Sequence, residues 1–121
     1  MRPLKVSNIF NNRTGLPYYD EMLENPEAAK YHRGLEVRVV PMSPRSFLQE
    51  VAKMQGTSLQ RQYEMVSPLA VEELRITVEM GVKLPMPVLD YARREHEGRH
   101  RAVLAEKLGI PQIPVLVVKE V

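Results

Sequence analysis

The sequence predicts a small α/β (α+β) domain in which helices pack on a mixed β-sheet. Leu35–Val40 alternates apolar with charged residues, as a half-buried strand does. Pro114–Val118 is a continuous apolar run of the kind found in the middle of a sheet. Helix starts accompany these strands, because Asn25, Ser43 and Ser67 each precede a proline, and a polar cap followed by proline is a common way to begin a helix.

Composition narrows the chemistry that the chain can perform. Of its 121 residues, 44% are hydrophobic and 26% are charged, which is enough apolar material for a buried core. The chain contains no cysteine, which excludes disulfides, thiolate metal sites and thiol nucleophiles. A formal charge of +2 permits contact with nucleic acid without requiring it. No apolar run has the length of a signal peptide or a membrane span, so we expect a cytoplasmic protein without membrane contact.

The chain divides into an N-terminal addition, residues 1–34, and a domain over residues 35–121, within one globular unit. Met1–Tyr19 lacks apolar periodicity and contains Asn-Asn-Arg-Thr-Gly, so we interpret it as an arm or loop. Tyr18 and Tyr19 within it are either an aromatic anchor for the arm or a base-stacking pair. The anchor is the more common use of such residues.

Helix caps, glycine stops and proline positions define the expected elements along the chain. The methionines, Met65 and Met80 among them, are expected to fill the core. In chain order we expect a helical turn at 20–24, a helix at 26–33, a strand at 35–40, helices at 44–55, 58–65 and 68–79, an extended segment at 83–87, a strand at 88–92, a polar turn at 93–96, a helix at 99–108 and a strand at 113–119.

The densest cluster of reactive and charged residues is Glu97-Gly98-Arg99-His100-Arg101. Gly98 turns the chain into a helix whose first free N–H groups favour anions, and arginine offers phosphate two parallel donors. Arg99 and Arg101 point about 200° apart, because successive helical residues are separated by about 100°. We therefore expect His100 and Arg101 at the ligand, with Arg99 more exposed. The sequence predicts that Gly98, Arg99, His100 and Arg101 bind a phosphate group.

Residues 97–118 resemble the signature half of the ParB/sulfiredoxin-like superfamily. Members of this superfamily carry a Gly-x-x-Arg turn that opens an alanine-rich helix, then Leu-Gly, and then Ile-Pro-Val before a strand. The corresponding residues here are Gly98–Arg101, Leu108-Gly109 and Ile113–Val115. Upstream, Pro85–Val88 resembles the segment that precedes the turn in the family.

The resemblance implies a fold that binds a nucleotide triphosphate, ATP or CTP with Mg²⁺, with its phosphates in the Gly-x-x-Arg turn. Gly98 would let the backbone approach the phosphates. Arg101 matches the family arginine, and His100 matches the histidine before it in sulfiredoxins. Glu97 could contact Mg²⁺ or act as a catalytic base. Asp90, at the end of the preceding strand, is a second candidate for a catalytic carboxylate.

The chain also departs from the family. The catalytic cysteine of sulfiredoxins would fall at Arg99, so their repair chemistry is excluded. ParB proteins carry a second box, Glu-Asn-x-x-Arg, for nucleotide and metal, and Leu59–Gln62 does not match it. His96 and His100 have no obvious third ligand, so no metal site is expected.

Three functions remain open. The first is nucleotide binding, with NTPase or phosphotransferase activity that would use one of the two carboxylates. The second is a nucleic-acid-binding accessory protein of the phage or plasmid type, or a nuclease-like domain, whose arginines hold the DNA backbone. The third is a degenerate family member that serves as a structural or interaction module. The arginines of the second hypothesis are Arg93, Arg94, Arg99 and Arg101.

Overall fold

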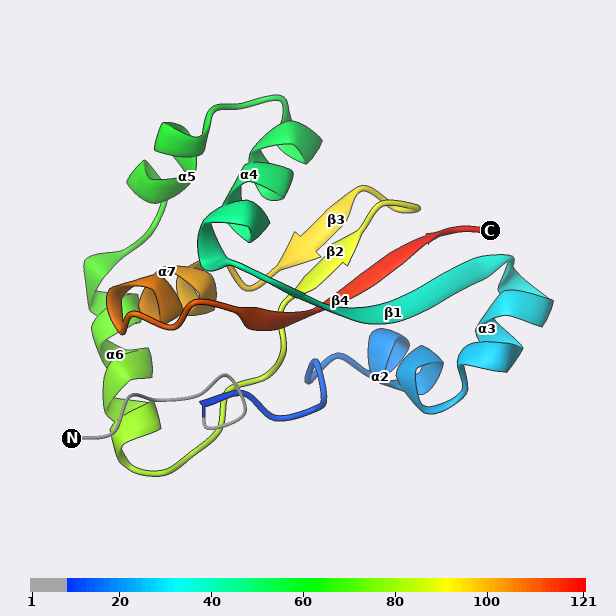
Figure 1. Ribbon diagram of the computed structural model, residues 1–121, viewed down its shortest axis with the longest axis horizontal. Helices are drawn as coiled ribbons and strands as arrows, with labels where there is room; N and C mark the ends of the chain where they lie inside the picture. Colours follow the sequence, from blue (N-terminus) through cyan, green and yellow to red (C-terminus); the bar gives the residue numbers. More distant parts are fainter. Residues whose placement is uncertain (1–8) are drawn as a thin grey trace.

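The structure, a computed structural model, describes residues 9–121 and has the expected α+β class, with helices packed on both faces of a four-stranded mixed sheet (Figure 1). The strand order is β1-β4-β2-β3, with β4 antiparallel to β1 and parallel to β2, and with β3 antiparallel to β2. Within the described residues no helix is both long enough and apolar enough to cross a membrane. The elements are α2 Pro17–Glu24, α3 Pro26–Arg33, β1 Leu35–Met42, α4 Pro44–Gln55, α5 Leu59–Glu64, α6 Pro68–Glu79, β2 Val88–Asp90, β3 Glu95–Glu97, α7 Arg99–Lys107 and β4 Ile113–Glu120.

The sheet has two apolar faces, because side chains at alternate strand positions point to opposite sides. On one face, Val115 of β4 packs in the core formed by α4, α6 and α7, which includes the buried Phe47. On the other face, Leu116 packs against Tyr19 and Met22 of α2. The helices α2 and α3 therefore share the core of the sheet instead of standing apart from it (Figure 1).

Four helices begin with a side-chain cap. Asn25, Ser43, Ser58 and Ser67 each accept a hydrogen bond from the backbone N–H three residues further on, at 3.0 to 3.2 Å. The three predicted starts of the cap-then-proline type are thus confirmed. Two of the described helices lack such a cap. Leu16 precedes α2 and makes no cap hydrogen bond, although Asp20 places a carboxylate in the first turn. Gly98 stands at the cap position of α7 and provides no side chain.

The N-terminal segment is more regular than the sequence predicted. The helix α2 begins at Pro17, so Tyr18 and Tyr19 are helical, and the expectation of an arm up to Tyr19 is wrong for these residues. Tyr19 is buried, which makes it the packed anchor of the two alternatives considered for it. The part of the predicted arm before residue 9 lies outside the described residues.

The structure also corrects the prediction between β2 and α7. The predicted strand Val88–Ala92 ends at Asp90, and the predicted polar turn Arg93–His96 is partly a strand. Glu95–Glu97 forms β3, which pairs with β2. Its strand character comes from this pairing, because nothing in a run of two glutamates and a histidine favours a strand.

Two methionines were wrongly assigned to the core. Met65 and Met80 are exposed, as are Leu69 and Ile76 on α6. The inner face of α6 is formed instead by Val71, together with partly buried residues that pack on the core, Leu74 and Val78.

Candidate functional site

The candidate site lies where β3 runs into α7. Gly98 makes this turn with a φ of 118°, a conformation that residues with a side chain rarely adopt. A Cβ atom at Gly98 would lie 2.7 Å from the Cβ of Pro87, well inside the contact distance of two carbon atoms. The turn therefore requires glycine for two reasons, its left-handed φ and its contact with Pro87. This contact holds the backbone at the start of α7 against the end of the extended segment before β2.

Arg99 is held in place by two glutamines. Its Nε donates to Oε1 of Gln62 at 2.8 Å, and its Nη2 donates to Oε1 of Gln55 at 3.4 Å. Nε2 of Gln62 in turn donates to Gln55 Oε1 and to Thr57 Oγ1, both at 2.8 Å, and the Gln62 side chain is fully buried. Because Gln62 is buried and both its Oε1 and its Nε2 are paired, it has few alternative arrangements, and it orients the guanidinium of Arg99 in advance of any ligand.

The same network determines the protonation of His96. Arginine only donates, so Oε1 of Gln55 is fixed as an acceptor, and its Nε2 faces Nε2 of His96 at 2.8 Å. With Gln55 in this orientation, the ring nitrogen accepts a hydrogen bond, which places the proton on Nδ1 and leaves the ring neutral. Nδ1 itself is buried and has no hydrogen-bond partner among the described residues. Burial and, to a smaller extent, the charge of Arg99 lower the pKa of His96, in agreement with a neutral ring.

A pocket of about 150 Å³ opens at the start of α7. His100 on its wall is oriented by α6, because Nε2 of His100 accepts a hydrogen bond from the N–H of Ser67 at 3.1 Å. The first N–H groups of α7 have no side-chain cap. The pocket thus combines helix N–H groups, an oriented guanidinium, two imidazoles and one carboxylate. Its lining residues are His96, Glu97, Gly98, Arg99 and His100.

Arg101 lies beside this pocket and is not on its wall. Its side chain is only 13% exposed, and its Nη1 lies 3.5 Å from Oε1 of Glu97. Its Nε and Nη2 are buried and have no hydrogen-bond partner in the part of the chain that the structure describes, and burial lowers the pKa of the guanidinium. We expected His100 and Arg101 at the ligand; the structure instead places His100 and Arg99 on the wall, with Arg101 behind them.

The two candidate carboxylates occupy different environments. The Glu97 side chain is 51% exposed and lines the pocket. Asp90 is fully buried and does not line it. The Tyr19 hydroxyl donates to Oδ2 of Asp90 at 2.8 Å, and the N–H of Arg93 donates to Oδ1 at 3.0 Å. Both oxygens of Asp90 therefore hold α2 and the β2–β3 turn in place, and burial together with Asp90 raises the pKa of the Tyr19 hydroxyl.

The four arginines proposed for DNA contact interact with different parts of the protein. The guanidinium carbon of Arg93 lies 4.7 Å from the centre of the Tyr18 ring on α2. The next residue, Arg94, has a left-handed φ of 56° and donates to the carbonyl of Met54 on α4. Arg93 and Arg94 therefore contact helices on opposite faces of the sheet. Arg99 and Arg101 lie in the first turn of α7.

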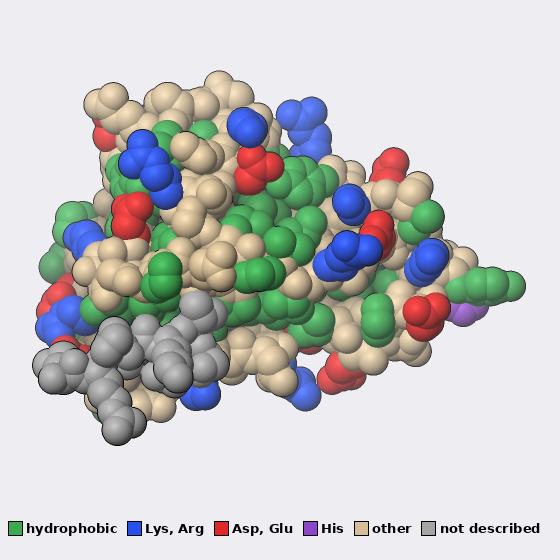
Figure 2. Space-filling model, viewed as in Figure 1, with side chains coloured by type: hydrophobic (Ala, Val, Ile, Leu, Met, Phe, Trp, Pro, Cys, Tyr) green, Lys and Arg blue, Asp and Glu red, His purple; other side chains and the backbone are tan. Residues whose placement is uncertain are grey.

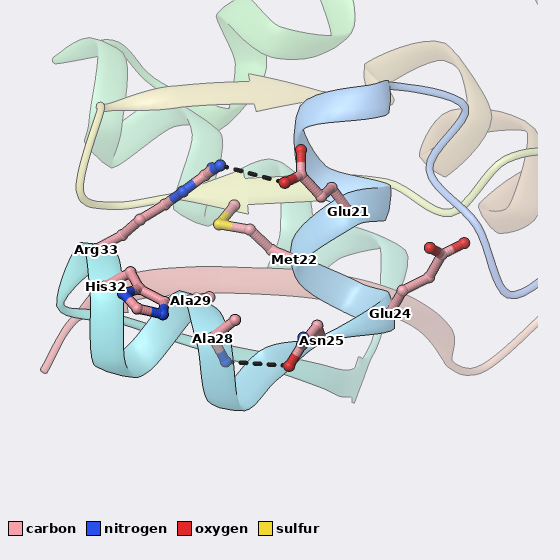
Figure 3. A pocket seen from close by; sticks show the side chains of 8 residues that line it. All are labelled: Glu21, Met22, Glu24, Asn25, Ala28, Ala29, His32 and Arg33. Carbon is pink, nitrogen blue, oxygen red and sulfur yellow. Dashed lines mark hydrogen bonds and ion pairs between the residues drawn. The ribbon is translucent and has the colours of Figure 1, made fainter.

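A second hollow, of about 270 Å³, lies between α2 and α3 (Figure 3). Charged groups pair across and beside it, with Arg33 at 3.5 Å from Glu21 and Arg13 at 3.4 Å from Glu24. Asn25 in its wall caps α3. These contacts hold the two helices together, so we interpret this hollow as a helix junction.

Sequence reasoning missed the residues that orient Arg99. Gln55 and Gln62 were not considered, and His96 was considered only as a metal ligand. One signal could have identified Gln62: it lies three residues after Leu59 on the inward face of α5, where a glutamine is unusual. Among the described residues no group of three or more His, Asp or Glu is placed to hold a metal ion.

The chain was compared with known proteins at three levels. No protein-family model, no curated protein and no solved structure matches it. The resemblance to the ParB/sulfiredoxin-like superfamily consequently rests on the motif at residues 97–118 alone.

Proposed function

We propose that this chain binds the phosphate groups of a nucleotide at the turn from β3 into α7, as a relative of the ParB/sulfiredoxin-like proteins. The observation that carries the proposal is Arg99, which the buried Gln62 and the exposed Gln55 orient at the wall of a pocket that the uncapped start of α7 also lines. A fixed guanidinium and free helix N–H groups are the two donor types that recognise phosphate most often.

The electrostatics of the turn support the same ligand. Cations are unfavourable in the first turn of a helix, since that end of the helix dipole is positive. Arg99 and Arg101 nevertheless occupy the first and third positions of α7. The negative charge of a bound phosphate would offset the repulsion between these groups. It would also attract the guanidinium of Arg101 behind the pocket wall, where Nη1 is paired with Glu97 and Nε and Nη2 have no partner among the described residues.

The size of the pocket defines the part of a nucleotide that it would hold. A volume of about 150 Å³ is well below the range of pockets that enclose whole drug-sized ligands, roughly 300 to 1,000 Å³. The proposed site therefore holds phosphates and leaves the nucleoside outside. We expect affinity to rise with the number of phosphates and to depend little on the base.

Glu97 is the residue that would contact Mg²⁺ on a bound nucleotide. Mg²⁺ is commonly held by one or two carboxylates together with substrate phosphates, and Glu97 supplies one exposed carboxylate beside the pocket. NTPase or phosphotransferase activity would rest on Glu97 alone, because both oxygens of Asp90 are engaged by Tyr19 and Arg93. The proposal is accordingly one of binding.

The test is calorimetric titration with ATP, ADP, CTP, GTP and inorganic tripolyphosphate, with and without Mg²⁺. The informative variant is Arg99→Gln, and the matched control is Arg61→Gln, which removes an exposed arginine that pairs with Glu64 on α5. We expect binding of the triphosphates and of tripolyphosphate, lost in Arg99→Gln and retained in Arg61→Gln.

The alternatives give other outcomes in the same experiment. A folded protein that binds none of these ligands contradicts the proposal. If such a protein binds DNA with a steep dependence on salt, the nucleic-acid hypothesis replaces it. If it binds neither, the chain is a structural or interaction module.

A further inference from the structure

Within residues 9–121, β1 forms an edge of the sheet, because β4 is its sole neighbour in the strand order. In Figure 1 it crosses the front of the molecule, with α4 on one side and α2 and α3 on the other. Figure 2 shows a band of hydrophobic side chains across the middle of this face, where Figure 1 places β1. At eight residues β1 is long for an unpaired edge, and such edges tend to pair with another strand.

One hydrogen bond identifies the backbone groups that point away from the sheet. The N–H of Val121 donates to the carbonyl of Gly34 at 2.9 Å, so in this antiparallel ladder the even-numbered residues of β1 bond to β4. The odd-numbered residues, Leu35, Val37 and Val39, then direct both their N–H and their C=O outward. Within residues 9–121, no hydrogen bond from outside the β1–β4 ladder reaches these groups.

Pro41 marks where this free edge ends. It is the next outward-pointing residue, and proline has no N–H to donate. An N–H at this position would face away from β4, so proline removes no hydrogen bond between β1 and β4. It does prevent an added strand from pairing beyond Val39. Of the three outward-pointing residues before it, the Leu35 side chain is buried, that of Val37 is partly buried, and Val39 is 48% exposed.

The charges on β1 define which strand would fit. The side chains of Glu36 and Arg38 lie on the face of the sheet opposite to those of Leu35, Val37 and Val39. They form an ion pair at 2.9 Å, and the Arg38 side chain is 70% exposed. An antiparallel copy of the same strand, centred on Val37, would place Glu36 opposite Arg38 of the partner subunit at both ends of the pair. Opposite charges at such positions stabilise a strand pair, and like charges destabilise it.

We propose that two copies of this chain associate through β1, as an antiparallel pair centred on Val37 that joins the two sheets into one. This interaction is independent of the phosphate site, which lies at the other edge of the sheet, beyond β3. Val37 would pair with Val37 of the partner subunit, and Leu35 with Val39 of the partner subunit. The two-fold axis repeats the Leu35–Val39 pair, so the interface has three residue pairs. Each pair would form two backbone hydrogen bonds, since all of the residues involved direct both groups outward.

The neighbouring registers are disfavoured by charge or by proline. A pair centred on Arg38 sets two arginines opposite each other, and one centred on Glu36 sets two glutamates opposite each other. A pair centred on Val39 assigns Pro41 to a position that needs an N–H donor. The register centred on Val37 avoids all three conflicts, and it is isologous, as a two-fold dimer requires.

The first test measures the mass of the full chain by light scattering and sedimentation over a range of concentrations. We expect a dimer that dissociates on dilution. Arg38→Glu and Glu36→Arg each create like-charge pairs, so each variant is expected to be monomeric, whereas an equimolar mixture of the two is expected to form a dimer. The double variant E36R/R38E should also dimerise. Circular dichroism establishes that each variant is folded.

The second test uses the absence of cysteine from the chain. Val37→Cys places two thiols on the two-fold axis, where paired Cα atoms lie about 5.5 Å apart, within disulfide reach. Val39→Cys places them four residues apart along the strands, about 13 Å, beyond that reach. Mild oxidation should cross-link the first variant and not the second.

Two results would overturn the proposal. The first is a wild-type chain that stays monomeric at its highest soluble concentration. The second is a dimer that persists unchanged in Arg38→Glu, or that cross-links as readily through Val39→Cys as through Val37→Cys, since either would place the interface elsewhere.

Discussion

The helices α4 and α7 pack against each other but begin in opposite ways. At the start of α4, Ser43 accepts a hydrogen bond from the N–H of Ser46 at 3.0 Å, and Pro44 occupies the first helical position. At the start of α7, Gly98 has a left-handed φ of 118°, offers no cap, and is followed by three basic residues. One start satisfies its own N–H groups, and the other leaves them available.

This difference separates stability from function. A serine cap contributes about 1 kcal/mol, and cations at a helix start cost roughly 0.3 to 1 kcal/mol each. The helix α2 also lacks a side-chain cap, but Asp20 gives its first turn a favourable carboxylate. Only α7 among the described helices combines a missing cap with basic residues at its first and third positions. Departures from such local rules tend to concentrate at functional sites, and α7 departs from two of them within four residues.

The largest expected effect is that of Gly98→Ala. The new Cβ would lie 2.7 Å from the Cβ of Pro87 at a left-handed φ, so we expect the free energy of unfolding to fall by about 3 kcal/mol. Urea denaturation measures this loss. Gly56→Ala, at the end of α4, is the matched control: its φ is 68° and nothing lies within 4 Å of the new atom, so a loss of about 1 kcal/mol is expected. Equal losses would show that contact with Pro87 does not constrain the turn.

Gln62→Leu should have the next largest effect. The substitution removes the buried amide that orients Arg99, and Thr57 and Gln55 each lose a hydrogen bond. We expect the free energy of unfolding to fall by about 2 kcal/mol. Affinity for tripolyphosphate should fall together with stability, because Arg99 is released. Gln60→Leu on the same helix is exposed and is expected to change neither quantity. A Gln62→Leu variant with unaltered affinity would show that Arg99 needs no orientation.

Ser43→Ala sharpens the comparison from the side of α4. The loss of the hydrogen bond to Ser46 should lower the free energy of unfolding by about 1 kcal/mol, measured by urea denaturation. Calorimetry should show the affinity for tripolyphosphate unchanged, since α4 contributes only its C-terminal Gln55 to the site. A parallel loss of affinity would mean that the two helix starts are coupled.

The smallest expected effect is the pH dependence that His96 contributes. Burial lowers its folded-state pKa below the ordinary value of 6.5, so the unfolded chain takes up the proton first as pH falls. The free energy of unfolding should therefore decrease as pH falls below 6.5 and level off once the folded state is protonated as well. Urea denaturation of His96→Gln should lack this component, and His32→Gln should retain it. A stability that rises on acidification through this window would show that the network favours the charged ring.

Much of the fold was predictable because its determinants are local. Caps, prolines and glycines mark most helix ends within a few residues of sequence, and the strands β1 and β4 carry enough apolar residues to be recognised. The strand β3 was missed for the opposite reason: Glu95, His96 and Glu97 are extended because β2 pairs with them, and that information is distant in sequence.

The candidate site was predictable only in part. The angle between Arg99 and Arg101 followed from helix geometry, but the choice of which of them faces the pocket depends on Gln62, which lies 37 residues away along the chain. The burial of Asp90 likewise depends on Tyr19, 71 residues away. Contacts of this kind leave no local pattern, so a sequence can suggest a phosphate site without specifying its donors.

The most direct test of the central claim is an NMR titration of the isotope-labelled protein with inorganic tripolyphosphate, in which the backbone amides at the two helix starts are followed together. The account predicts saturable shifts of Gly98, Arg99 and His100, with Ser46 at the capped start of α4 unmoved. Absence of shifts at α7, or equal shifts at both helix starts, would contradict it.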